Sequence, residues 1–146
     1  MQLVYETLPE GFSPKVEVVA CFCLLDDKIL FLKRNKDKPQ GETWGVPAGK
    51  LEQDEQLQCA IIREVFEETC IVIQEKEIEF LKTVYVRYPE NDFVYHMFRY
   101  KLFDYPSEMK ISKREHQEAK WVTPQQALKM ELIPGENECI HMIFNV

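Results

Sequence analysis

Three glutamates lie close together in a segment whose apolar residues have helical periodicity. Glu64, Glu67 and Glu68 are three and four residues apart, so they share an arc of about 100° on one helix face. Like charges at this spacing destabilise a helix by a few tenths of a kcal/mol per pair, and the negative end of the helix dipole adds a similar amount. We therefore expect a positive partner, either Arg63 or a divalent cation. Oxygen ligands favour a hard ion such as Mg²⁺ or Mn²⁺, and the alternative is a solvated acidic face.

The helix that carries these carboxylates is predicted from about Glu55 to Thr69. Within it Leu57, Ile61 and Val65 recur every fourth residue, which places them on one buried stripe. The segment ahead of the helix is rich in glycine, and three of the five glycines of the chain fall within nine residues: Gly41, Gly45 and Gly49. Such a segment indicates a tight turn or a close approach of the backbone to a ligand.

Apolar, β-branched segments on both sides of this helix predict strands. The predicted strands cover residues 16–25, 28–33, 79–88, 93–103 and 120–122. Two more helices are predicted over residues 124–130 and 136–144, the first opened by the capping box Thr123-Pro124-Gln125-Gln126. Strands before, between and after helices predict an α/β (α+β) fold with a mixed sheet covered on both faces. No repeat or linker divides the chain, so we expect a single domain over residues 1–146.

The composition excludes several classes of protein. Lys and Arg number 18 against 25 Asp and Glu, a net charge of −7, which disfavours binding to duplex nucleic acid. The longest apolar run, Val18 to Leu25, is far shorter than the roughly 20 residues of a membrane-spanning helix. We also expect no secretory signal and a cytoplasmic location, because the N-terminus lacks a basic and apolar leader. Five cysteines without a CxxC pair fit that reducing compartment.

The spacing of the acidic segment closely resembles the 23-residue signature of the Nudix hydrolases. The matching residues are Gly49, Glu55, Arg63-Glu64-Val65, Glu67-Glu68 and Ile71, while Cys70 stands where the family has glycine. The approach from Trp44 to Glu52 is also similar to that of the family. The resemblance implies a Nudix-type α/β/α sandwich with a central mixed sheet. It also implies metal-dependent hydrolysis of a nucleoside diphosphate linked to another moiety.

The resemblance also implies roles for individual residues. The metal ligands for Mg²⁺ or Mn²⁺ would be the carbonyl of Gly49 and the carboxylates of Glu64, Glu67 and Glu68, while Arg63 would orient Glu64 and Glu55 would brace the loop. The general base is open between a glutamate of the signature, such as Glu64, and an acid on a later loop, where the candidates are Glu115 and Glu118. His116 is a rival base, although a lone histidine in a polar loop is usually solvated.

Candidate substrate-binding residues flank the signature. Arg34 belongs to a basic cluster with Lys33, Lys36 and Lys38 that either binds phosphate or is a solvated loop. Lys50 follows the signature glycine directly. Tyr88 lies 17 residues past Ile71, near where diadenosine polyphosphate hydrolases of the family have a tyrosine.

The favoured function is metal-dependent hydrolysis of the diphosphate linkage of a nucleoside triphosphate or a related nucleoside diphosphate derivative, which releases a nucleoside monophosphate and pyrophosphate. The alternatives are a dinucleoside polyphosphate hydrolase and a catalytically silent nucleotide-binding domain. The sequence leaves open the substrate base, the leaving moiety and the oligomeric state, including a homodimer. At Cys70, where glycine would supply a left-handed conformation, the sequence implies a helix end that is either strained by about 1 kcal/mol or re-routed.

Overall fold

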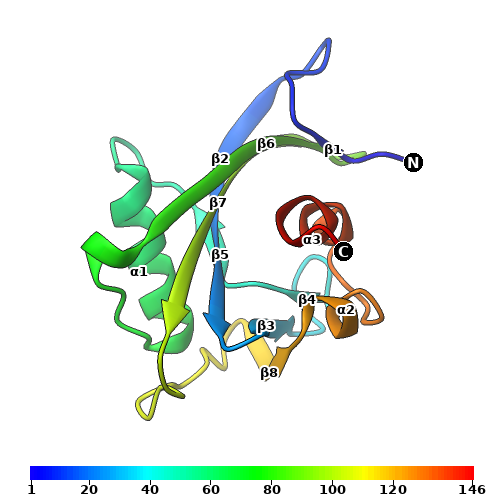
Figure 1. The fold of residues 1–146 in the computed structure, drawn as a ribbon. Helices are drawn as coiled ribbons and strands as arrows, with labels where there is room; N and C mark the ends of the chain where they lie inside the picture. The colour runs from blue at the N-terminus through cyan, green and yellow to red at the C-terminus, as the bar shows by residue number, and fades with distance from the viewer.

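A single mixed sheet runs through the protein (Figure 1), and the computed structural model describes residues 1–146. Its strands are β1 (Val4–Tyr5), β2 (Pro14–Leu25), β3 (Lys28–Arg34), β4 (Trp44–Gly45), β5 (Ala48–Lys50), β6 (Glu79–Arg87), β7 (Asp92–Leu102) and β8 (His116–Val122). The strand order is β1-β6-β7-β2-β3-β4, with β5 paired to β2 and β8 paired to β3. The strands β2 and β7 run parallel, and every other pair is antiparallel, so the predicted mixed sheet is confirmed.

Helices cover both faces of the sheet, with α1 on one side and α3 on the other (Figure 1). The helices are α1 (Leu57–Thr69), the 3₁₀ helix η1 (Glu75–Glu77), α2 (Pro124–Ala127) and α3 (Glu136–Phe144). The capping box predicted at Thr123 and Gln126 is formed, with both of its hydrogen bonds present. No helix combines the length and the apolar character needed to cross a bilayer.

The central strands β2 and β3 are buried on both faces, which explains their nearly continuous apolar sequence. Along β2, Val19 and Cys21 pack in the cluster that contains Ile61 of α1. The alternate residues Ala20 and Phe22 pack in a second cluster that contains Ile140 of α3. The strand thus anchors two cores, one beneath each helix.

Several boundaries differ from the sequence prediction. The strand β8 begins at His116 instead of residue 120, and α2 ends at residue 127 instead of 130. The short strands β1, β4 and β5 were not predicted, because two or three residues have no measurable periodicity. The first residues of β8 are polar, yet they pair with the backbone of β3. Hydrogen bonds between the two strands therefore decide the conformation there, and the polarity of the side chains does not.

The C-terminal end of α1 is joined to the loop that precedes β8. The backbone N–H groups of Lys110 and Ser112 donate to the carbonyls of Thr69 and Glu68, at 2.9 and 3.0 Å. These bonds satisfy carbonyls that a helix end otherwise leaves without partners. They also bring the segment from Ser112 to His116 against the glutamates of α1.

Cys70 has the left-handed conformation that glycine would supply at this position of the signature, with φ 64° and ψ 10°. Its N–H donates to the carbonyl of Phe66 at 2.8 Å, which closes the helix end. A residue with a Cβ is strained in this region, and glycine is not.

We predict that Cys70→Gly raises the melting temperature by a few degrees, because relief of about 1 kcal/mol of backbone strain exceeds the entropy gained by the unfolded chain. The matched control is Cys70→Ala, which removes the thiol but keeps the strain. Thermal melts should place Gly above Ala. A Gly variant that melts below Ala would show that the half-buried thiol contributes more than the strain costs.

Candidate active site

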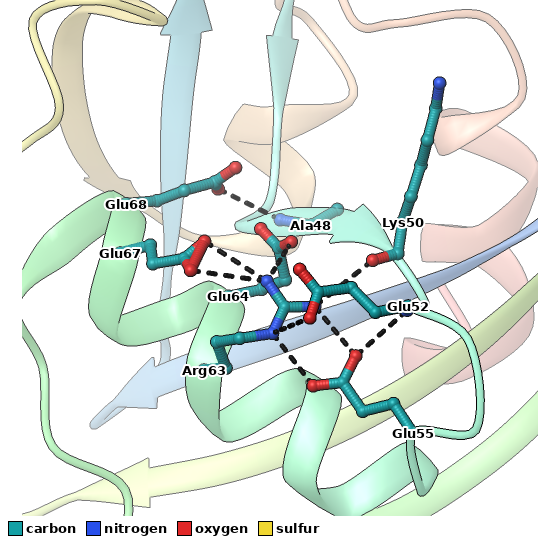
Figure 2. Close-up of polar contacts among 8 residues, drawn as sticks. All are labelled: Ala48, Lys50, Glu52, Glu55, Arg63, Glu64, Glu67 and Glu68. Atoms are coloured by element: carbon teal, nitrogen blue, oxygen red, sulfur yellow. Dashed lines mark hydrogen bonds and ion pairs between the residues drawn. The ribbon is translucent and has the colours of Figure 1, made fainter.

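The guanidinium of Arg63 lies at the centre of the acidic segment (Figure 2). Its Nε and Nη2 donate to the two carboxylate oxygens of Glu55 at 2.8 and 2.9 Å. Its Nη1 donates to Glu64 at 2.8 Å and to Glu67 at 3.2 Å. Its Nη2 also reaches the backbone carbonyl of Lys50 at 3.2 Å. One cation therefore joins two glutamates of α1 to the loop that precedes the helix.

Glu55 is the brace between this loop and α1. The hydrogen bonds from Arg63 and from the N–H of Glu52 lower its pKa to about 2, so the pair stays ionised at neutral pH. The hydrogen bonds to Glu55, Glu64 and Glu67 in turn raise the pKa of Arg63. A two-pronged bond between guanidinium and carboxylate fixes the orientation of both groups.

Gly49 makes room for the carboxylate of Glu64. A Cβ at Gly49 would lie 2.0 Å from Cδ of Glu64, so no other residue fits without displacing that carboxylate. Gly49 is held in β5 opposite Val19 of β2, which fixes its backbone against the sheet. Burial raises the pKa of Glu64, although Arg63 opposes the shift.

Glu68 lies outside the reach of Arg63 and has little exposure to water. Its side chain accepts one hydrogen bond, from the N–H of Ala48 at 3.1 Å (Figure 2), and the residue is only 5% exposed. Burial raises its pKa well above the ordinary value, and the nearby charges of Glu64 and Glu115 raise it further. The end of α1 therefore carries a buried carboxylate without a cationic partner.

Glu115 and His116 complete a cluster with Glu68. One oxygen from each glutamate and one ring nitrogen of the histidine lie within 4.8 Å of one another. The expectation of a solvated histidine was wrong, because His116 is the first residue of β8, paired with Arg34, and only 5% exposed. Burial lowers its pKa to about 4, so its imidazole is neutral at neutral pH.

Asn35 positions this cluster, and sequence reasoning missed it. Its side-chain amide donates to the carbonyls of Lys113 and Arg114, both at 2.9 Å, and its backbone N–H donates to the carbonyl of Glu115 at 2.9 Å. Three hydrogen bonds from one residue clamp the loop just before β8. No signal in a single sequence connects Asn35 with a segment about eighty residues away.

The other residues that the sequence suggested for catalysis or substrate binding lie outside the cluster of Glu68, Glu115 and His116. Glu118 is exposed on β8 opposite Lys33 and does not join it. Lys50 is exposed, and its side chain extends away from the carboxylates (Figure 2). The Nε of Arg34 donates to the carbonyl of Pro39 at 2.7 Å. Tyr88 donates its hydroxyl to the carbonyl of Pro134 at 2.8 Å.

A small apolar cavity of about 20 Å³ lies between β6, β7 and the start of α3. Tyr88, Tyr95 and Glu136 supply its polar groups. The carboxylate of Glu136 is fully buried and lies 3.4 Å from the hydroxyl of Tyr95 and 3.4 Å from the N–H of Val46. Burial raises its pKa to about 7.

Comparison with known proteins identifies the fold and the acidic segment together. Residues 14–142 match the sequence profile of the NUDIX domain. The chain belongs to the Nudix family. It is 29% identical to the CTP pyrophosphohydrolase of Escherichia coli over 123 residues, which cover 83% of this chain and 85% of that protein. As the signature implied, this protein is a Nudix hydrolase.

Solved structures of Nudix proteins have the same architecture. The ORF135 protein of Escherichia coli aligns with a TM-score of 0.73 at 26% identity, covering 94% of this chain and 93% of that one. The MutT protein of Methanosarcina mazei Go1 aligns with a TM-score of 0.77 at 23% identity, covering 91% and 95%. The α/β/α sandwich expected from the signature is therefore confirmed.

Nudix hydrolases generally use a divalent metal ion, and the residues at the end of α1 fit one. Glu115 lies close enough to Glu64 and Glu68 that its charge raises the pKa of both, and Glu64 also raises the pKa of Glu68. Arg63 neutralises Glu64 but not Glu68. Buried carboxylate oxygens without a cation are the donors that a hard divalent ion requires.

We predict that Gly49→Ala lowers the melting temperature by several degrees, because a methyl group in the space of the Glu64 carboxylate costs about 1–3 kcal/mol. Glu64→Ala removes the clash, so Gly49→Ala should cost much less in that background. Thermal melts of the two single variants and the double variant measure the coupling. Additive effects would contradict the close contact.

The buried Glu136 predicts a pH-dependent stability. Its pKa of about 7 in the folded protein exceeds the ordinary value of 4.5, so the folded state keeps a proton that the unfolded chain releases between these pH values. Stability should therefore fall as the pH rises from about 4.5 to about 7. Glu136→Gln cannot ionise, so its melting temperature relative to wild type should be higher at pH 8 than at pH 5.

The control for this pH dependence is the exposed Glu131. Glu131→Gln should follow wild type at both pH values in the same thermal melts. An equal difference between Glu136→Gln and wild type at pH 5 and pH 8 would contradict a buried carboxyl that titrates near neutrality.

Proposed function

We propose that residues 1–146 form one Nudix domain that hydrolyses a nucleoside triphosphate with the help of Mg²⁺ or Mn²⁺, releasing a nucleoside monophosphate and pyrophosphate. The observation that carries the proposal is the pairing of the buried Glu68 with the partly buried Glu115, two adjacent carboxylates without a cationic side chain. The similarity to a CTP pyrophosphohydrolase supports a triphosphate substrate. Cysteines without disulfides suit a reducing compartment, so we place the enzyme in the cytoplasm.

The proposed metal ligands are the carbonyl of Gly49 and the carboxylates of Glu64, Glu67 and Glu68. A bound divalent ion would neutralise the phosphate oxygens and lower the pKa of a coordinated water. Arg63 holds Glu64 and Glu67 in place through hydrogen bonds, and Glu55 holds Arg63. The network thus fixes ligands whose mutual repulsion would otherwise separate them.

Glu115 is the residue that we propose as the proton acceptor for the attacking water. It lies against Glu68 and is partly shielded from solvent, and Asn35 and Ser112 fix its backbone. Glu118, the other acid left open by the sequence, is exposed and lies outside this cluster. A base must reach the reacting proton, so position favours Glu115.

The proposed substrate-binding residues are Arg34, Lys50 and Tyr88. Burial lowers the pKa of His116, and the positive charge of Arg34 adds to this shift. Burial raises the pKa of Tyr88, and the same charge of Arg34 opposes that shift. Arg34 therefore lies near both the acidic cluster and the apolar cavity. A guanidinium at this place suits the phosphate chain of a nucleotide.

We predict that Glu115→Gln lowers kcat at least about 100-fold with little change in KM, because a general base acts mainly in the transition state. The matched control Glu118→Gln should keep a rate near that of wild type. Both are measured as pyrophosphate release from CTP in Mg²⁺, with a chelator blank. A loss of rate in Glu118→Gln alone would assign the base to that residue, and wild-type rates in both would assign it to the signature, with Glu64 first.

A substrate panel separates the remaining functions. Nucleoside triphosphates, a dinucleoside polyphosphate and ADP-ribose are incubated with the protein, and the products are resolved by chromatography. Preference for the dinucleoside polyphosphate would replace the triphosphate proposal. Binding of nucleotides without any turnover in Mg²⁺ or Mn²⁺ would identify a silent nucleotide-binding domain.

A further inference from the structure

The three histidines of the chain differ in what their ring nitrogens contact. His96 is bonded at both nitrogens, to Thr83 at 2.8 Å and to Glu17 at 2.7 Å. His141 is exposed and its Nδ1 is bonded to the carbonyl of Val146. His116 is 5% exposed, and its Nδ1 is buried with no hydrogen-bond partner. A buried polar atom without a partner is costly, so its presence calls for an explanation.

His116 faces carboxylates that Arg63 does not neutralise. Arg63 pairs with Glu55, Glu64 and Glu67. The carboxylate oxygens of Glu68 and Glu115 instead lie within 4.8 Å of a ring nitrogen of His116. This corner of the site thus combines two oxygen donors with a neutral nitrogen donor. Such a set is the ligand type of a transition-metal ion.

The backbone holds His116 in this position before any ion binds. Its N–H donates to the carbonyl of Ser112 at 2.9 Å, and Ser112 itself donates to the carbonyl of Glu68 at 3.0 Å. On the other side His116 pairs with Arg34 of β3. Little ordering is therefore needed when an ion binds, which favours affinity.

We propose that His116 supplies a nitrogen ligand to the divalent ion held by Glu68 and Glu115, and that this ligand makes the site select Mn²⁺ over Mg²⁺. The inference rests on the metal-dependent function proposed above and specifies its ion. Mg²⁺ is bound almost entirely through oxygen. Affinity for a site with nitrogen ligands rises along the first-row divalent ions from Mn²⁺ onward, so an added imidazole favours Mn²⁺ over Mg²⁺. Because a carboxylate has two oxygens, Glu115 donates one to the ion and keeps the other as proton acceptor.

The direct test is pulsed electron paramagnetic resonance of the wild-type protein loaded with Mn²⁺, without substrate. A ligated imidazole produces ¹⁴N modulation of the Mn²⁺ echo. We expect this modulation in wild type, its loss in His116→Gln and its retention in His141→Gln. The last variant is the matched control, because it removes an imidazole that lies outside the cluster.

Competition titrations of Mn²⁺ against Mg²⁺ provide the second readout. His116→Gln should lower the affinity for Mn²⁺ about 10-fold and change the affinity for Mg²⁺ less than about 3-fold, because Mn²⁺ gains more from a nitrogen ligand than Mg²⁺ does. His141→Gln should leave both affinities unchanged. Equal losses for the two ions would overturn the proposal.

The outcomes separate this inference from the function on which it rests. Absence of ¹⁴N modulation in wild type overturns the role of His116 without any variant, so a His116 variant that fails to fold does not block the test. If Mn²⁺ still binds in that case and Glu68→Gln abolishes binding, the metal-dependent function stands. If wild type binds neither ion, the metal-dependent function fails together with the inference.

Discussion

The guanidinium of Arg63 is the one cation among the glutamates at the active-site end of α1, and the geometry of the site depends on it. It contacts Glu55, Glu64 and Glu67 within 3.2 Å and the carbonyl of Lys50 at the same distance. Without it, Glu64 and Glu67 would repel one another on successive turns, toward the negative end of the helix dipole. Because Lys50 belongs to β5, the hydrogen bond to its carbonyl also ties this strand to α1, where Gly49 lies against Glu64.

The limited reach of Arg63 divides the carboxylates into two groups. Those that it contacts share one positive charge, whereas Glu68 and Glu115 are left with one another and with the neutral ring of His116. Burying such groups without a cation is unfavourable, so the fold must hold them by other means. Asn35, Ser112 and the pairing of β8 with β3 do so through backbone hydrogen bonds. The placement of Glu68 and Glu115 therefore lowers the stability of the folded protein, and a divalent ion bound between them would offset this loss.

The sheet carries a different functional candidate on each of its two faces. Its α1 face carries the acidic cluster, and its α3 face forms the apolar cavity with Tyr88, Tyr95 and Glu136. The strand β2 is buried on both faces and pairs with β3, β5 and β7, so it relates the two regions rigidly. The two regions differ in chemistry, because one gathers carboxylates and the other is a cavity of about 20 Å³ with mostly apolar walls, room for about one water molecule.

The sequence by itself determined the features that depend on local periodicity. The stripe of Leu57, Ile61 and Val65 and the shared face of Glu64, Glu67 and Glu68 follow from residues within one helix, and the spacing from Gly49 to Ile71 indicated the family. The left-handed turn at Cys70 was one of the two alternatives that the sequence left open, because the end of a helix depends mainly on residues near it in the chain. Both strands of the apolar hairpin at residues 16–33 were predicted for the same reason.

Only the tertiary structure decided which distant groups meet. The sequence treated Glu115 and Glu118 alike and expected His116 to be solvated, whereas the pairing of β8 with β3 buries His116 and leaves Glu118 exposed. The clamp from Asn35 joins segments about eighty residues apart. The periodicity of the sequence shows on which face of its own helix or strand a side chain lies. Whether that face meets solvent or another segment is set by backbone hydrogen bonds between elements, which residue types alone do not encode.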